Sequence, residues 1–311
     1  MIDGHTQLVG LIGWPVEHSL SPAMHNAAFD ALGLNWRYVP LPVQPGQVEL
    51  AVRGLAALGL RGANVTVPHK RAVIPALDTL GLSARTLGAV NTLVIGRKEG
   101  KPPTVVGYNT DAKGFVSALR QDGFEPEDGG NAVIVGAGGA ARAVAFGLLV
   151  SGTGSVTVLN RTPERAQTLT SDLGDGHPMW SSRLRALALT PETLIESARG
   201  ADLLVNATTV GMWSQASGTT PQGPAQRSIW PDDVPIPPHL TVFDLVYNPL
   251  ETHLLHQTRR GGARAIDGLG MLVRQGALAF DLWTNQGFDV AEVAALMRAA
   301  CERAICAAHP I

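Results

Sequence analysis

Hydrophobic and polar positions follow one another along the chain in two recurring patterns. Short apolar runs bounded by turn residues are typical of buried strands, and longer stretches with apolar residues every three or four positions are typical of helices. The first pattern predicts strands at about residues 8–12, 36–41, 64–67, 90–95, 104–107, 132–135, 155–159, 202–206 and 241–245. The second predicts helices at about residues 21–32, 48–58, 111–121, 140–150, 163–173, 270–284 and 290–307, and a further helix beginning near 68. This alternation indicates an α/β fold.

Residues at the ends of two predicted helices mark where these helices begin or stop. Ser21 is expected to be the N-cap of its helix, with Pro22 at the first helical position and Gly33 just past the end. Gly59 is expected to end the helix that begins at Val48. The stretch 211–238, rich in Pro, Gly, Ser and Gln, shows neither pattern and predicts a long surface excursion or lid.

A short strand beginning at Asn64 ends on Lys70, after a turn marked by Pro68. The chain has only four lysines among its 24 lysine and arginine residues, so we do not expect this lysine to be merely a solvent-exposed charge without a specific role. A lysine can exchange a proton with a reacting group, which an arginine cannot do. Asn64 and Thr66 occupy alternate strand positions and therefore face the same side. The segment predicts a polar site with a proton-transferring lysine, and a solvated lysine beside an edge strand is the alternative.

A glycine-rich turn joins the strand at 132–135 to an alanine-rich helix. Its residues are Gly136, Ala137, Gly138, Gly139, Ala140 and Ala141, which match G-x-G-x-x-G/A with alanine in the last place. Glycines in such a turn let backbone N–H groups approach a pyrophosphate at the positive end of the helix. The strand, turn and helix together predict a dinucleotide-binding unit.

The strand at 155–159 leads to Asn160, Arg161 and Thr162, and Arg165 follows one turn into the next helix. A site for NAD usually carries an acidic residue about twenty positions after the glycines, where it accepts hydrogen bonds from the ribose 2′-hydroxyl. Here that place holds an amide and a guanidinium, which suit a 2′-phosphate. The sequence therefore predicts NADP(H) as the cofactor. The alternative is that Arg161 and Arg165 only solvate a helix start.

Composition narrows the classes of function. A length of 311 residues suggests two domains, and a formal net charge of −2 without a basic block argues against a nucleic-acid partner. No apolar run is long enough to span a membrane, and the first residues lack a signal-peptide pattern, which favours the cytoplasm. Cys301 and Cys306 have neither a disulfide nor a metal-ligand spacing, so no metal is expected. The oligomeric state stays open, with a homodimer among the options.

The chain resembles the shikimate dehydrogenases in a series of segments that run in the family's order. These are Ser19–Asn26, Asn64–Lys70, Gly88–Thr92, Gly107–Gly114, Gly136–Arg142, Asn160–Thr162, Asn206–Thr208, Asp244–Pro249 and Asp267–Leu272, with Gln275. The resemblance implies reversible NADPH-dependent reduction of 3-dehydroshikimate to shikimate, on the pathway to the aromatic amino acids. It also implies a substrate-binding domain of residues 1–111 and 248–311, and a Rossmann-like NADP-binding domain of residues 112–247.

The resemblance assigns roles to the matching residues. Lys70 and Asp111 would be the catalytic pair, which moves a proton at the reacting oxygen while hydride passes through the nicotinamide. The substrate is expected to contact Ser19, Ser21, Asn64, Thr66, Asn91, Asp111, Tyr247 and Gln275, with the serines and the tyrosine at its carboxylate. Beyond the glycine turn and the segment 160–165, the NADP cofactor is expected to contact Asn206, Ala207, Thr208, Met212, Leu245, Gly268 and Met271.

Several of these positions have a second interpretation. Ser21 and Asp111 would also serve at helix starts, and Met212 would also serve as an ordinary core side chain. His69 stands where many relatives carry an apolar aromatic side chain, and we expect it to pack or to be solvated rather than to act in catalysis. Residues 213–238 are longer and richer in proline than the family suggests.

Two other functions are compatible with the sequence. A quinate/shikimate dehydrogenase of the same architecture would use a broader range of ring substrates or cofactors. A non-catalytic NADP(H)-binding sensor would regulate a partner protein, but it would need no proton-transferring Lys70 and Asp111.

Overall fold

The computed structural model describes residues 2–126, 130–212 and 227–308. The chain divides into two compact units, one of residues 1–111 with 273–311 and the other of residues 112–272. The second unit extends past the expected boundary at 247. The reason is that α10 (His253–Arg260) is followed by β12 (Arg264–Ile266), which pairs with the sheet of the second unit.

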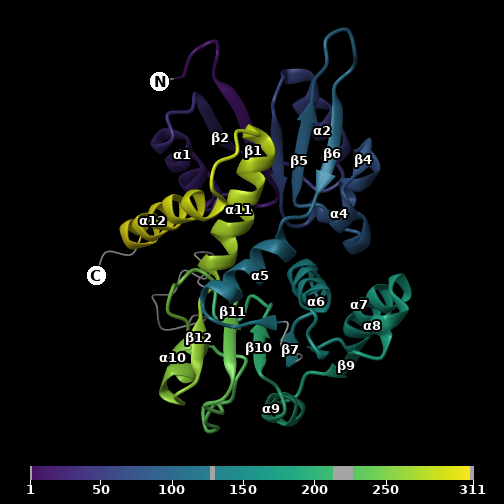
Figure 1. The fold of residues 1–311 in the computed structure, drawn as a ribbon, viewed down its shortest axis with the longest axis vertical. Coiled ribbons are helices and arrows are strands. Elements are labelled where there is room, and N and C mark those ends of the chain that lie inside the picture. Colours follow the sequence, from purple (N-terminus) through teal and green to yellow (C-terminus); the bar gives the residue numbers. More distant parts are fainter. Residues whose placement is uncertain (1, 127–129, 213–226, 309–311) are drawn as a thin grey trace. The chain divides into compact units, whose positions relative to one another are not determined.

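The first unit is built on a six-stranded sheet in the order β2-β1-β3-β5-β6-β4 (Figure 1). Its strands are β1 (Gln7–Gly13), β2 (Trp36–Pro42), β3 (Gly62–Val65), β4 (Thr79–Leu80), β5 (Thr92–Gly96) and β6 (Thr104–Tyr108). Strands β1, β2 and β3 are parallel, whereas β5 is antiparallel to both of its neighbours. The helices are α1 (Ser21–Ala31), α2 (Val48–Leu58), α3 (His69–Ala72), η1 (Ile74–Ala76), α4 (Leu82–Leu87), the part of α11 (Leu269–Thr284) from residue 273 onward, and α12 (Val290–Ala308).

Two groups of apolar side chains stabilise the first unit. The apolar stripe of α2, with Val52 and Leu55, belongs to one buried cluster with strand residues such as Val65. Phe29 of α1 stacks on Phe280 of α11, with ring centroids 4.9 Å apart. Burial of large aromatic and aliphatic side chains of this kind supplies most of the favourable free energy of folding.

The second unit contains a fully parallel sheet in the order β12-β11-β10-β7-β8-β9 (Figure 1). Its other strands are β7 (Asn131–Val135), β8 (Ser155–Asn160), β9 (Leu184–Ala188), β10 (Leu203–Asn206) and β11 (Thr241–Asp244). Its other helices are α5 (Asp111–Gln121) from residue 112 onward, α6 (Gly139–Ser151), α7 (Pro163–Gly176), α8 (Pro178–Ser181) and α9 (Pro191–Arg199). Counted from β7, the order is 3-2-1-4-5-6, which is that of doubly wound dinucleotide-binding domains.

Both faces of this parallel sheet are buried. Successive side chains of a strand point to opposite faces, and β7 shows the consequence. Ile134 belongs to an apolar cluster with residues of α5, α6 and α7, whereas Val133 and Val135 belong to a second cluster with residues of α9 and α10. The sheet therefore presents its strand ends, rather than its faces, to any ligand.

Several sequence-based expectations need correction. Ser21 is the first residue of α1 and not its N-cap, because Leu20 occupies that place without a side-chain capping bond. The helix expected from about residue 68 is only the short α3. Residues 213–226 of the expected surface excursion lie outside the described residues, and residues 227–238 are not simply a surface loop. They bury Trp230, whose Nε1 donates to the carbonyl oxygen of Val234 at 2.8 Å.

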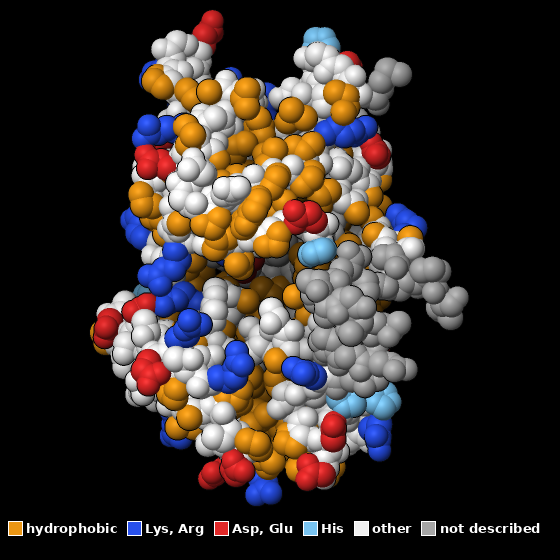
Figure 2. Space-filling view, turned by 180° about the vertical axis from the view of Figure 1, so that it is seen from behind, with side chains coloured by type: hydrophobic (Ala, Val, Ile, Leu, Met, Phe, Trp, Pro, Cys, Tyr) orange, Lys and Arg blue, Asp and Glu red, His pale blue; other side chains and the backbone are white. Residues whose placement is uncertain are grey.

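The face drawn in Figure 2 carries hydrophobic side chains over much of the middle of its upper part, whereas basic and acidic side chains lie mainly around the outline there and are mixed over the lower part. Within the described ranges, no helix has both the length and the apolar character needed to cross a membrane.

Candidate active site

The first unit contains an ion pair between the two residues expected to be catalytic. Lys70 lies in α3, directly after the turn that follows β3, and Asp111 is the first residue of α5. The Nζ atom of Lys70 donates to Oδ2 of Asp111 at 2.6 Å, although 41 positions separate the two residues in sequence. The Asp111 side chain is 8% exposed and that of Lys70 is 22% exposed. The ammonium is therefore held against a buried carboxylate while remaining partly accessible to a ligand.

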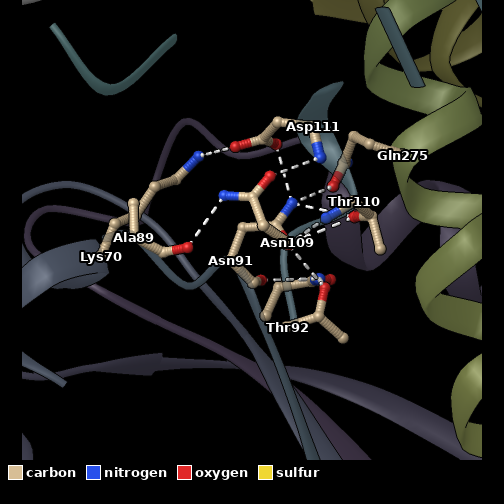
Figure 3. Close-up of polar contacts among 9 residues, drawn as sticks. Lys70, Ala89, Asn91, Thr92, Asn109, Thr110, Asp111 and Gln275 are labelled. Carbon is tan, nitrogen blue, oxygen red and sulfur yellow. Dashed lines mark hydrogen bonds and ion pairs between the residues drawn. The ribbon is translucent and has the colours of Figure 1, made fainter. Parts of the chain in front are cut away.

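Asn91 connects this ion pair to the rest of a polar cluster (Figure 3). Its Nδ2, which carries two hydrogens, lies within hydrogen-bond distance of three acceptors: the second carboxylate oxygen of Asp111 at 2.7 Å, Oγ1 of Thr110 at 2.9 Å and Oε1 of Gln275 at 3.2 Å. Its Oδ1 accepts hydrogen bonds from the Thr110 backbone N–H at 2.9 Å and the Thr92 hydroxyl at 2.9 Å. Both oxygens of Asp111 therefore have side-chain donors, which fixes the carboxylate next to Lys70.

Asn109 holds the backbone at the start of α5. Its Oδ1 accepts from the Asp111 N–H at 3.1 Å, and its Nδ2 donates to the Ala89 carbonyl at 3.1 Å (Figure 3). No role was expected for Asn109, Thr92 or Thr110, although all three stand in the segments that resemble the family. Their only signal in the sequence is a polar residue where a buried strand or its end is expected.

The other expected substrate residues lie in two different units. Ser19 and Ser21 lie at the start of α1, where the Ser21 N–H donates to Oγ of Ser19 at 3.2 Å. Asn64 is buried in β3 and donates from Nδ2 to the Asn91 carbonyl at 3.2 Å, so it belongs to the cluster around Lys70. Thr66 follows β3 in the same unit. Tyr247, by contrast, follows β11 in the second unit.

His69 is buried next to Lys70 and has a structural partner. Its Nε2 lies 2.6 Å from the carbonyl oxygen of Val43, and the ring is 1% exposed. The expectation that His69 packs is confirmed, whereas solvation is not observed.

The glycine turn of the second unit provides an open helix N-terminus. Gly136 follows β7 with a φ of 113°, a conformation that favours glycine, and a Cβ there would lie 2.9 Å from the Ala207 carbonyl oxygen. Gly138 is the N-cap of α6, where no side chain caps the helix, and a Cβ built on it would meet nothing within 4 Å. The first N–H groups of α6 therefore fit an incoming pyrophosphate.

The residues expected at the 2′-phosphate form the connection between β8 and α7. Asn160 ends β8, and its Nδ2 donates to the Thr162 carbonyl at 2.9 Å, which shapes the turn. Arg161 and Arg165 are exposed, and neither forms an ion pair with a described carboxylate. Two guanidinium groups without carboxylate partners suit a phosphate group.

The remaining expected cofactor residues follow three neighbouring strands. Asn206, Ala207 and Thr208 lie at the end of β10, next to β7, where the strand order reverses and where such sheets usually bind dinucleotides. Leu245 follows β11, and Gly268 and Met271 follow β12. Ala207 follows β10 and donates its N–H to the Val135 carbonyl at 2.8 Å. Gly268 packs so tightly on Leu245 that a Cβ would lie 2.3 Å from the Leu245 carbonyl oxygen. Met212 is 40% exposed, which excludes the core-packing alternative, whereas Met271 lies in the apolar core at 9% exposure.

Asp244, at the end of β11, fixes the loop that carries Asn206 and Thr208. Its Oδ1 accepts from Asn206 Nδ2 at 2.9 Å and from the Val246 N–H at 3.1 Å, and its Oδ2 accepts from the Thr252 hydroxyl at 2.7 Å. The Oδ1 of Asn206 in turn accepts from the hydroxyl of Thr208 at 2.7 Å. Burial raises the pKa of the Asp244 carboxyl to about 6, although these hydrogen bonds act in the opposite direction.

Replacing Asp244 by Asn is expected to change how stability depends on pH. The folded protein holds the Asp244 proton more tightly than the unfolded chain, so this carboxyl favours folding most at a pH below 3.8 and progressively less as pH rises through 6. The free energy of unfolding of the wild type, minus that of the variant, is therefore expected to fall by about 2–3 kcal/mol between pH 4 and pH 7. Urea unfolding of both proteins at several pH values between 4 and 7 measures this difference in the free energy of unfolding. A difference that does not depend on pH would contradict the expectation.

Comparison with known proteins gives a consistent result across the chain. Family models match residues 11–93 (shikimate dehydrogenase substrate binding domain), residues 118–220 (shikimate/quinate 5-dehydrogenase) and residues 268–300 (shikimate 5′-dehydrogenase C-terminal domain). A relative named shikimate dehydrogenase (NADP(+)) from Moorella thermoacetica is 46% identical, with 96% of this chain and 95% of the relative covered.

Solved structures agree with the sequence matches. A crystal structure of a shikimate dehydrogenase in complex with NADP+ has a TM-score of 0.81 and 38% identity, and it covers 98% of each chain. The shikimate dehydrogenase of Thermus thermophilus, in complex with NADP(H) and shikimate, has a TM-score of 0.74 and 38% identity, and covers 95% of this chain and 100% of the other. On the strength of identity over nearly its whole length, this chain belongs to the shikimate dehydrogenase family.

Proposed function

We propose that this chain is an NADP-dependent oxidoreductase that interconverts 3-dehydroshikimate and shikimate in aromatic amino-acid biosynthesis. The observation that carries the proposal is the 2.6 Å ion pair between Lys70 and Asp111, set among amide side chains that can hydrogen-bond a polyhydroxylated ring. When an alcohol carbon loses hydride, its oxygen must also lose a proton, and Lys70 is placed to take part in that transfer.

The protein chain supplies the proton and holds the proton-transferring side chain in place. Bound NADPH supplies the hydride that reduces the ketone carbon. Lys70 gives its proton to the ketone oxygen as the alcohol forms, and takes it back in the reverse direction. Asp111 holds the ammonium in place, and Asn91 holds the second oxygen of Asp111. The ketone therefore gains one hydride and one proton, which balances the reduction.

The substrate assignment follows from the polar groups available. The hydroxyls of Ser19 and Ser21, with Tyr247, would bind the substrate carboxylate. The ring hydroxyls would be bound by Asn64, Thr66, Asn91, Asp111 and Gln275. A buried polar group left unpaired costs about 1–3 kcal/mol, so a ligand without the matching hydroxyls would be discriminated against.

The cofactor assignment rests on the second unit. The backbone from Gly136 to Ala140 would bind the pyrophosphate at the start of α6. Arg161, with Asn160, Thr162 and Arg165, would bind the 2′-phosphate. The nicotinamide half would be contacted by Asn206, Ala207, Thr208, Met212, Leu245, Gly268 and Met271. Met271 would contribute only through its small exposed fraction.

We place the protein in the cytoplasm, where thiols stay reduced. This location is supported by two cysteines, Cys301 and Cys306, that are both free in the structure. A homodimer remains a prediction.

Steady-state rates with four substrate–cofactor pairs test the proposed function: shikimate or quinate, each with NADP+ or NAD+. The highest kcat/KM is expected for shikimate with NADP+, at least about tenfold above the other three pairs. Comparable rates with quinate would favour the quinate/shikimate dehydrogenase alternative. Absence of any shikimate oxidation by the pure protein would overturn the proposal in favour of the sensor.

A further inference from the structure

The serine segment 19–26 ends in His25 and Asn26, to which the substrate and cofactor assignments give no role. Both residues lie in α1 and hold Tyr38 of β2. Asn26 binds the backbone of Tyr38, since its Oδ1 accepts from the Tyr38 N–H at 2.8 Å and its Nδ2 donates to the Tyr38 carbonyl at 3.0 Å. The ring of His25 stacks on the ring of Tyr38, with centroids 4.4 Å apart and planes 1° from parallel. Two successive residues therefore clamp both the backbone and the ring of Tyr38.

The buried environment of the clamp keeps Tyr38 a hydrogen-bond donor. Burial lowers the pKa of His25 to about 3, so its ring stays neutral. Burial also raises the pKa of Tyr38, so its hydroxyl keeps its proton. His25 thus acts as a flat neutral support, while the Tyr38 hydroxyl has a proton to give.

The Tyr38 hydroxyl begins a directed series of hydrogen bonds, which we call the amide relay: Tyr38, Asn64, Thr92, Asn91 and Asp111. Tyr38 Oη donates to Asn64 Oδ1 at 2.9 Å. In this orientation the Asn64 Nδ2 faces the carbonyl oxygen of Asn91 at 3.2 Å. The same Nδ2 donates to the Thr92 hydroxyl at 3.2 Å, and that hydroxyl donates to Asn91 Oδ1 at 2.9 Å.

The last part of the amide relay is directed in the same way. Asn91 Oδ1 must be an acceptor, because the Thr110 backbone N–H donates to it at 2.9 Å. Its Nδ2 therefore faces Asp111, whose other oxygen accepts from Lys70. Asn64, Thr92, Asn91 and Asp111 are all buried, and hydrogen bonds in a poorly solvated series polarise and strengthen one another.

We propose that Tyr38 is a positioning residue, whose clamped hydroxyl fixes the amide of Asn64 and, through the amide relay, the carboxylate of Asp111. The inference rests on the proposed function, since it gives that reaction a further determinant outside the groups that contact substrate. Tyr38 itself touches neither ligand in the assignment above. Tyr38 instead affects how the side chains of Asn64, Asn91 and Asp111 are oriented.

The test begins with Tyr38→Phe, which keeps the stack on His25 and removes only the hydroxyl. Asn64 then lacks its donor and its amide loses a fixed orientation. We expect kcat/KM for shikimate to fall about 5–30-fold, mostly through KM, as befits one unpaired buried acceptor. The affinity for NADPH, measured by fluorescence titration, is expected to stay unchanged.

Tyr108→Phe is the matched control, because Tyr108 has the same side chain in the same unit and its hydroxyl takes no part in the amide relay. Its kinetics are expected to equal those of the wild type. Thr92→Val is expected to resemble Tyr38→Phe, whereas Thr92→Ser keeps the hydroxyl and is expected to restore most of the activity. The double variant Tyr38→Phe/Thr92→Val should lower kcat/KM little more than the worse of the two single changes, since both changes break the same relay.

An activity-independent measurement separates this inference from the proposed function. In the ligand-free protein, Tyr38→Phe is expected to shift or broaden the side-chain NH₂ resonances of Asn64 and Asn91 in a ¹⁵N spectrum, and Tyr108→Phe is not. A wild type that fails to oxidise shikimate would overturn the proposed function, and the spectrum would still decide the relay. Unchanged amide resonances, or wild-type kcat/KM with only a lower melting temperature, would overturn the positioning role of Tyr38.

Discussion

Replacing Lys70 by methionine is expected to lower kcat for shikimate oxidation by about 10²–10⁴-fold, the range that a positioned proton-transfer group contributes. Methionine has an unbranched side chain of similar length but no ammonium, so the group that donates to Asp111 at 2.6 Å is lost with little change in shape. The measurement is the steady-state rate with saturating shikimate and NADP+. The affinity for NADPH should not change, because the residues assigned to the cofactor belong to the second unit.

Lys113→Met is the matched control for this substitution. Lys113 is exposed on α5, two positions after Asp111, so the same chemical change next to the site should leave kcat unchanged. A thermal melt shows whether the Lys70 variant remains folded, since Asp111 loses its cation. The double variant Lys70→Met/Asp111→Asn, which leaves no unpaired charge, should be equally inactive. Full activity in either Lys70 variant would remove the lysine from the mechanism.

Local signals predicted some elements of the fold closely and missed others for a physical reason. Helix α2 spans the predicted residues, because an apolar stripe specifies its buried face and Gly59 ends it with a φ of 89°. Strand β9 has only half-buried or exposed residues, and β12 has three residues in all. Both strands form by pairing with β8 and β11, and such partners are not encoded in the local sequence.

In the candidate site, too, some features are encoded locally and others arise only from contacts between distant segments. Lys70 and Asp111 could be named from their segments, but their contact spans 41 positions, and that between Asn91 and Gln275 spans 184. Tyr38 was missed entirely. A tyrosine in an apolar strand resembles any other core residue, and only the fold shows that its hydroxyl meets Asn64 and its ring meets His25. Sequence reasoning finds the residues that carry unusual chemistry, whereas residues that orient them become visible through tertiary contacts.

Replacing Arg161 by alanine is expected to lower the preference for NADP+ over NAD+ by about 10–100-fold in kcat/KM. A hydrogen bond to a charged group contributes about 1.5–3 kcal/mol, and solvent exposure at this turn keeps the effect below the upper limit. The loss should fall on NADP+ alone, because NAD+ has no 2′-phosphate for the guanidinium to bind. The measurement is kcat/KM for each cofactor at saturating shikimate.

Arg199→Ala controls for the general loss of a positive charge. Arg199 is exposed at the end of α9, just before β10 begins, so it lies at the amino-terminal end of the parallel strands, whereas the turn that follows β8 lies at their carboxyl-terminal end. Its removal should leave the cofactor ratio unchanged. If Arg161→Ala kept the wild-type ratio of kcat/KM for NADP+ to that for NAD+, and Arg165→Ala lowered this ratio, the phosphate would be bound one turn into α7. If neither change affected the ratio, the 160–165 segment would not determine cofactor choice, and the NADP assignment would lose its structural basis in this chain.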